Sequence, residues 1–283
     1  MHDYLDQHPD IWMSSVKEPR FLSTDIEDHI RSRVIDASQY FGLFEGGREA
    51  RYRGESSVYY LYSDVACRRI GELSNDPRII IMIRNPVDFI QSIHGQFCYS
   101  LNETEWDITK ALELERERAA GRHIPPEAHT PLGLQYRKMA HFADRIEHYF
   151  KAFGRDRVHV IVFDDLKNDS MATFHRLLDF LQLPRIDPSI EAKNRATDRP
   201  SKNIVSGRLI KRLPGGYWLA KRVPKPLFVT VRWMLDRIFG RSDMSTQAMP
   251  AALRAQLTEE FRDEVERLGE LIGRDLSHWS KLD

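Results

Sequence analysis

The stretch RIIIMIRNPVDFIQS, residues 78–92, joins an apolar run directly to a helix start. Residues 78–83 carry the near-continuous apolar side chains that are typical of a strand buried on both faces of a parallel sheet. Asn85 can cap a helix, and Pro86 suits the first helical position because the N–H that it lacks would be unpaired there. The sequence therefore predicts a strand that ends at Arg84 and a helix that begins at once.

The junction at Arg84 has the chemistry of an anion site. Free backbone N–H groups, the positive end of the helix dipole and the Arg84 guanidinium meet there, and together they suit a phosphate or a sulfate. Ser92 lies two turns beyond Asn85 on the same helix face, where its hydroxyl can also donate. The local pattern leaves a second interpretation open, in which Arg84 pairs with Asp88 and Ser92 faces solvent.

Similar patterns recur along the chain and indicate its fold class. A second apolar run, at 157–163, has the character of the first. Helical periodicity marks the segments 62–73, 86–99, 134–150, 170–181 and 253–272. Helices that alternate with parallel strands predict an α/β fold, a three-layer sandwich with a central parallel sheet. Short connectors leave no boundary before about residue 190, which favours a single domain over 1–283.

The overall composition excludes several classes of protein. The 283 residues hold 42 basic and 42 acidic side chains, and zero net charge argues against a nucleic-acid partner. No secretory signal and no apolar run of membrane-spanning length is present in the sequence. Cys67 and Cys98 are the only cysteines, which favours packed thiols in a reducing cytoplasm. No cluster of His, Cys and Asp has metal-ligand spacing, so we expect no metal.

The segment 201–241 differs from the rest in its charge, with ten Lys and Arg residues against the single acid Asp236. Aromatic and aliphatic side chains are interleaved with these cations in a helical pattern. Such a basic helical segment could lie on an anionic membrane or help to hold an acidic acceptor. It could equally pack on the domain with its basic side chains reaching into solvent.

The motif Arg84-Asn85-Pro86-Val87-Asp88 with Ser92 resembles the 3′-phosphate-binding motif of the PAPS-dependent sulfotransferases, where PAPS is 3′-phosphoadenosine 5′-phosphosulfate. The similarity extends along nearly the whole chain, in the order found in bacterial and glycosaminoglycan-type members. The other matching segments are 4–11, 13–14, 17–19, 54–57 with Tyr60, 133–136, 153–154, 163–166, 180–181 and 273–279.

This resemblance implies a P-loop NTPase-like sulfotransferase fold and the transfer of a sulfuryl group from PAPS to a hydroxyl or amine, without a metal. It implies that Arg84 and Ser92 bind the cofactor and that Glu18, in Lys17-Glu18-Pro19, is the general base. Pro19 should restrict Glu18 to an extended backbone and so fix where the carboxylate points. Taken alone, Lys17 and Glu18 would be read as a solvated pair. The acceptor could be a small molecule, a lipid or a glycan.

The sequence departs from the family pattern at its start. Members carry a strand and a Gly-rich loop, which cradles the 5′-phosphosulfate, before the helix that begins here at Met1. We therefore expect an N-terminally truncated domain that binds PAPS weakly and turns over poorly. A smaller departure is Phe89, where many relatives place an arginine. The resemblance also suggests Lys202, in the polar segment 194–202, as a phosphate contact, although a plain loop fits that segment equally well.

Two alternative functions stay open at this point. A degenerate, non-catalytic nucleotide-binding module would keep the 3′-phosphate pocket and lose the reaction. Another phosphate-binding transferase, such as a nucleotide kinase, would require a Gly-rich loop and a magnesium-binding acid. The Lys-Glu-Pro turn at Glu18 favours sulfuryl transfer over phosphoryl transfer.

Overall fold

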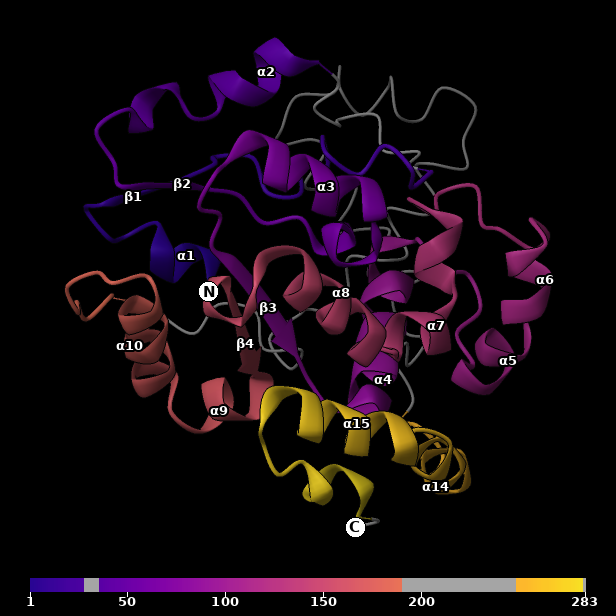
Figure 1. Ribbon diagram of the computed structural model, residues 1–283. Coiled ribbons are helices and arrows are strands. Elements are labelled where there is room, and N and C mark those ends of the chain that lie inside the picture. The colour runs from indigo at the N-terminus through magenta and orange to yellow at the C-terminus, as the bar shows by residue number, and fades with distance from the viewer. Residues whose placement is uncertain (28–35, 190–247, 282–283) are drawn as a thin grey trace, which may run out of the picture.

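The computed structural model describes residues 1–27, 36–189 and 248–281. Within these residues the strands form two separate two-stranded sheets, and both are parallel (Figure 1). The first sheet pairs β1 (Ile11–Met13) with β2 (Tyr52–Gly54), and the second pairs β3 (Ile79–Ile83) with β4 (Val158–Val162). The α/β class with parallel strands is therefore confirmed.

Helices surround both sheets. The helices are α1 (His2–Leu5), α2 (Ala37–Gly42), α3 (Asp64–Leu73), α4 (Pro86–Ser100), α5 (Ile108–Glu113), α6 (Glu115–Ala119), α7 (Tyr136–Ala140), α8 (Ala143–Phe153), α9 (Phe163–Asn168), α10 (Ser170–Phe180), α14 (Ala251–Glu260) and α15 (Arg262–Ile272). The 3₁₀ turns are η1 (Glu45–Gly47), η2 (Val58–Tyr62), η3 (Pro131–Leu134), η4 (Arg155–Arg157) and η6 (Ser277–Ser280).

Helices pack against both faces of the sheet of β3 and β4, although Met82 of β3 is 39% exposed. On one face Ile81 and Ile83 pack into a cluster with side chains of α8 and α15, including Ile146 and Leu268. On the other face Ile161 packs with side chains of α10 (Figure 1). Successive strand residues point to opposite faces, so a continuous apolar run is what two covered faces require. This half of the molecule has the predicted three layers.

The two sheets do not join within the described part of the chain. A groove of about 1180 Å³ lies between them, and its walls include residues of β2 and of β3. Tyr52 and Gly54 contribute to one wall, and Ile80 and Met82 contribute to the other. The predicted central sheet is thus divided into two pairs of strands.

Two of the predicted helices are broken. The segment 134–150 is interrupted between α7 and α8, where the backbone N–H groups of Phe142 and Ala143 each donate to Glu264 Oε1 at 2.7 Å. A carboxylate that accepts hydrogen bonds from two backbone N–H groups caps the start of a new helix at that point. The segment 253–272 is likewise divided at Phe261, between α14 and α15. The remaining helix predictions agree with α3, α4 and α10 to within two residues at each end.

Two of the predicted segments lie beyond the described parts of the chain. The basic segment 201–241 and the polar segment 194–202 with Lys202 lie outside the described residues, and the single-domain assignment stays a prediction. Among the described helices, none is long and apolar enough to cross a membrane.

Candidate functional site

The junction of β3 and α4 is built as its sequence predicts. β3 ends at Ile83, and α4 begins at Pro86 after an N-cap at Asn85. The Asn85 side-chain oxygen accepts hydrogen bonds from the backbone N–H of Val87 at 2.8 Å and of Asp88 at 3.4 Å. Arg84 therefore stands between a buried strand and the positive end of a 15-residue helix.

The Arg84 guanidinium lies 5.0 Å above the centre of the Phe163 ring. Phe163 follows β4 directly, and the register pairs Ile83 with Val162, so the two parallel strands bring Arg84 and Phe163 to the same edge of the sheet. We call Arg84, Asn85 and Phe163 the Arg84 pocket. Sequence reasoning missed Phe163 as a site residue, although the pairing of the two predicted strands would have placed it there.

The charge of Arg84 is poorly compensated. Its Nε is buried and has no hydrogen-bond partner, and among the described residues no ion pair reaches its guanidinium. Burial lowers the pKa of Arg84, while the nearby charges of Asp88 and Asp164 act in the opposite direction. An unpaired buried donor costs about 1–3 kcal/mol, so this arrangement fits an anion that would accept from it.

The alternative in which Arg84 pairs with Asp88 is not found. Asp88 instead accepts from Arg254 of α14, with 2.9 Å between Oδ1 and Nη2. Ser92 is exposed on the second turn of α4, about 10 Å along the helix axis from Asn85. In the described part of the chain the Ser92 hydroxyl makes no hydrogen bond, and its role in binding stays a prediction.

The C-terminal turn η6 contacts the residues around Arg84 through Trp279. Trp279 Nε1 donates to Asp164 Oδ2 at 2.6 Å, and Asn85 Nδ2 donates to the Trp279 carbonyl at 3.1 Å. Trp279 therefore connects the cap of α4 to the first turn of α9. The sequence motif at 273–279 had been matched to the family, but its contacts with the pocket were not foreseen.

Glu18 lies in a turn after β1 with an uncommon backbone. Glu18 and Arg20 have positive φ angles of 56° and 54°, on either side of Pro19. The prediction that Pro19 holds Glu18 in an extended conformation is therefore wrong. Non-glycine residues with positive φ cost about 1–3 kcal/mol, and such strain gathers at functional sites. We call residues 18–20 the Glu18 turn.

Hydrogen bonds from the segment after β2 hold Glu18 in this conformation. The Glu18 N–H donates to the carbonyl of Ser56 at 2.9 Å, and the Glu18 carboxylate accepts from the Val58 N–H at 3.1 and 3.3 Å. Arg20 Nε also donates to this carboxylate at 3.3 Å. Lys17 pairs with Asp3 at 2.5 Å, so the solvated Lys17–Glu18 pair is not found. These partners fix the carboxylate with about a third of the side chain exposed.

A buried group of hydroxyls supports the same turn from behind. The Arg20 N–H donates to Ser57 Oγ at 3.1 Å, and Ser57 Oγ donates to Glu55 Oε2 at 2.7 Å. The hydroxyls of Tyr40 and Tyr60 donate to Glu55 Oε1 at 3.0 and 2.6 Å. Burial raises the pKa of Glu55, although its three hydroxyl donors oppose the shift. Glu55 and Ser57 were matched to the family motif, but this support of Glu18 was not foreseen.

The two candidate regions belong to different sheets. Glu18 lies beside β1 and β2, whereas Arg84 extends from β3, and no hydrogen bond or ion pair joins these two described side chains. Among the described residues, no group of three or more His, Cys, Asp or Glu side chains could hold a metal ion.

Comparisons with known proteins agree with the sequence motif. The family model for the sulfotransferase domain matches residues 64–205, a range that contains Arg84 and Ser92. A solved sulfotransferase from Alicyclobacillus acidocaldarius is similar over 99% of this chain and 92% of that chain, with 27% identity and a TM-score of 0.69. The sulfotransferase domain from the curacin biosynthetic pathway matches 53% of this chain and 44% of its own, with 18% identity and a TM-score of 0.35. A search of curated proteins found no match.

Proposed function

The chain belongs to the sulfotransferase domain family, and on that premise we propose that it transfers a sulfuryl group from PAPS to a hydroxyl or amine acceptor. The observation that carries this proposal is Arg84, a half-buried cation with an unpaired Nε at the start of a helix. A phosphate matches it because a guanidinium, a helix N-terminus and backbone N–H groups all favour a dianion.

In the proposed reaction Arg84 binds the 3′-phosphate of the nucleotide, and the Ser92 hydroxyl donates to the same group. An oxygen or nitrogen of the acceptor forms a bond to the sulfur of PAPS. The bond from sulfur to the 5′-phosphate oxygen breaks, and adenosine 3′,5′-bisphosphate leaves with that electron pair. Glu18 takes the proton of the acceptor, which general-base catalysis requires to be within hydrogen-bond reach.

The Glu18 turn supports this role through its geometry. The carboxylate accepts from two donors, the Val58 N–H and Arg20 Nε, and is still partly exposed, so it can reach an acceptor without reorganising. Preorganised groups of this kind are a general source of rate acceleration. The acceptor that we propose is a small molecule, a lipid or a glycan, and the choice is left to the experiment.

The proposed location is the cytoplasm. Both cysteines, Cys67 and Cys98, are buried thiols that form no disulfide, which suits a reducing compartment. The contact of 201–241 with a membrane surface stays a prediction.

Binding of adenosine 3′,5′-bisphosphate tests the phosphate site independently of the acceptor. We expect calorimetry to show binding to the 283-residue chain and a loss of about 10- to 100-fold in Arg84→Gln, because one or two charged hydrogen bonds are lost. Arg155→Gln is a matched control, since Arg155 also lies over an aromatic ring, at 4.5 Å from the centre of Phe150. Equal affinities in the wild type and Arg84→Gln would overturn the assignment of the site.

Transfer of labelled sulfate from PAPS to a panel of sterols, sugars and phenols tests the reaction itself. Turnover with any acceptor supports the enzyme. Nucleotide binding that depends on Arg84, without transfer to any acceptor, would instead support the non-catalytic module. Transfer of phosphate from ATP, with no transfer from PAPS, would support another phosphate-binding transferase.

A further inference from the structure

Two carboxylates lie near Arg84, and each is engaged by a residue from the last part of the chain. Asp88 is in the first turn of α4, and Asp164 is in the first turn of α9. The charges of both groups act on Arg84, yet neither forms an ion pair with it. Asp88 accepts from Arg254, and Asp164 accepts from Trp279.

We propose that Arg254 and Trp279 are positioning residues, which hold Asp88 and Asp164 away from Arg84 and so keep its guanidinium available to a nucleotide phosphate. The identity of the ligand rests on the proposed function. The contacts that hold the two acids do not depend on it, because they are properties of the folded chain.

The contact with Asp164 is the more buried of the two. Trp279 is 4% exposed, and its Nε1 donates to Asp164 Oδ2 at 2.6 Å. His278 Nε2 lies 3.2 Å from the same oxygen. Asp164 immediately follows Phe163, the ring that Arg84 covers, so a carboxylate freed from Trp279 would have the neighbouring guanidinium as an alternative partner.

The backbone of Trp279 is fixed independently of its ring. Its carbonyl accepts from Asn85 Nδ2 at 3.1 Å, and Asn85 also caps α4. The hydrogen bond from Asn85, the residue after Arg84, therefore helps to direct the indole N–H toward Asp164. Removal of the indole N–H should leave Asp164 with only the longer of these two contacts, the one from His278, and keep the backbone contact of Trp279 in place.

The contact with Asp88 comes from a different helix. Arg254 Nη2 donates to Asp88 Oδ1 at 2.9 Å and to Gln91 Oε1 at 3.0 Å, so its guanidinium bridges two residues of α4. The charge of Asp88 acts on Arg84, so this acid lies near enough to compete for it. Arg254 supplies the competing cation that keeps this acid occupied.

The consequence for binding follows from competition. If an acid occupies Arg84 most of the time, the apparent affinity for a phosphate falls by the fraction of molecules in which Arg84 is free. For one partly buried ion pair we expect a loss of about tenfold. The contacts of Arg254 with Asp88 and of Trp279 with Asp164 should therefore affect nucleotide affinity. Neither Arg254 nor Trp279 needs to touch the nucleotide for this effect.

A double-mutant cycle on Trp279 and Asp164 tests the proposal by calorimetry with adenosine 3′,5′-bisphosphate. Trp279→Phe keeps an aromatic ring, smaller than the indole, and removes the N–H, and we expect affinity to fall about tenfold. Asp164→Asn should strengthen binding much more in the Trp279→Phe background than in the wild type, because only the freed carboxylate competes for Arg84. A simple loss of nearby negative charge would strengthen binding equally in both backgrounds.

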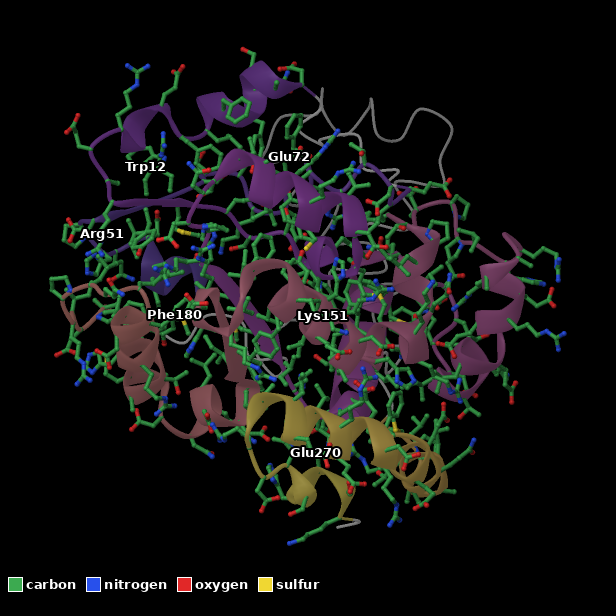
Figure 2. All side chains as sticks on the ribbon, in the orientation of Figure 1. Trp12, Arg51, Glu72, Lys151, Phe180 and Glu270 are labelled. Carbon is green, nitrogen blue, oxygen red and sulfur yellow. The ribbon has the colours of Figure 1, made fainter. Side chains whose placement is uncertain are left out.

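Trp12→Phe is a matched control. Its indole Nε1 also donates to an acceptor, the Leu43 carbonyl at 2.9 Å, and Figure 2 shows Trp12 far from Glu270 and the C-terminal helices. The same substitution there should leave nucleotide affinity unchanged. A fall equal to that in Trp279→Phe would contradict the proposal.

A second, independent cycle uses Arg254→Gln with Asp88→Asn, so the proposal can still be tested if Trp279→Phe does not fold. We expect the same coupling, with Arg262→Gln as the control because, within the described part of the chain, Arg262 forms its ion pair with Glu259 alone. If Arg84→Gln still weakens nucleotide binding but the folded double mutants show no coupling, the inference about Arg254 and Trp279 is wrong. Loss of the Arg84 dependence itself would overturn the proposed function instead.

Discussion

The Arg84 pocket and the Glu18 turn are held in place by different physical means. Arg84 follows a five-residue apolar strand that packs into the core and leaves Met82 exposed, and it precedes a capped helix of 15 residues. Glu18 follows a strand of three residues and has a strained backbone conformation that hydrogen bonds maintain. Apolar packing is spread over many contacts, whereas a hydrogen-bonded turn depends on a few named groups.

This difference separates the effects of substitutions in the two regions. Changes in single polar groups around Glu18 should alter turnover and leave nucleotide binding intact, because those groups lie beside a different sheet. Changes around Arg84 should alter nucleotide binding first. The division between the two sheets, with a groove of about 1180 Å³ between them, makes the two effects independent.

The largest effect should come from Glu18→Gln, which keeps the shape of the side chain and removes its basicity. We expect turnover with PAPS to fall by about 10²- to 10⁴-fold, the usual contribution of a general base. Affinity for adenosine 3′,5′-bisphosphate should stay the same. Single-turnover kinetics and calorimetry on one preparation measure both quantities. Unchanged turnover would show that Glu18 is not the base.

A smaller effect on turnover should come from Ser57→Ala, which removes the hydroxyl between Arg20 and Glu55. The Arg20 N–H would lose its acceptor, and we expect a fall of about tenfold in turnover as the turn loosens. Ser100→Ala is a control, because Ser100 Oγ donates to a carbonyl of its own helix at 2.9 Å. Loss of nucleotide affinity in Ser57→Ala would show that the two regions are coupled.

The sequence predicts the Arg84 pocket better than the Glu18 turn, and the reason is the range of the interactions. The apolar run before Arg84, the cap at Asn85 and the proline after it are all local signals, and each is confirmed in β3 and α4. The Glu18 turn depends on Ser56 and Val58, about forty residues away in sequence. Local preference before a proline favours extended backbone, and these distant partners override it.

The same argument explains the other differences from the sequence analysis. The break between α7 and α8 depends on Glu264, more than 120 residues further along the chain. The contact of Trp279 with Asp164 spans 115 residues. Helical periodicity carries no information on such partners. The position of Phe163 beside Arg84 could have been predicted. If the two apolar runs are paired as parallel strands with their ends aligned, the residues that follow them lie side by side.

The smallest effect that we predict concerns Glu55 and the dependence of stability on pH. Burial, with a contribution from the charge of Glu18, raises the pKa of Glu55 in the folded chain. The folded state then binds this proton more tightly than the unfolded state. The stability contributed by Glu55 is therefore fully present below its ordinary value of 4.5 and is lost as the pH rises through the raised pKa.

Glu55→Gln should remove this dependence, because a glutamine does not titrate. We expect the difference in unfolding free energy between the wild type and Glu55→Gln to decrease with pH above about 4.5 and then to level off. Urea denaturation at a series of pH values measures it, and other titrating groups cancel between the two proteins. In the Glu18→Gln background the difference should level off at a lower pH, since the neighbouring charge is gone. A difference that is the same at every pH would mean that the pKa of Glu55 is not raised in the folded chain.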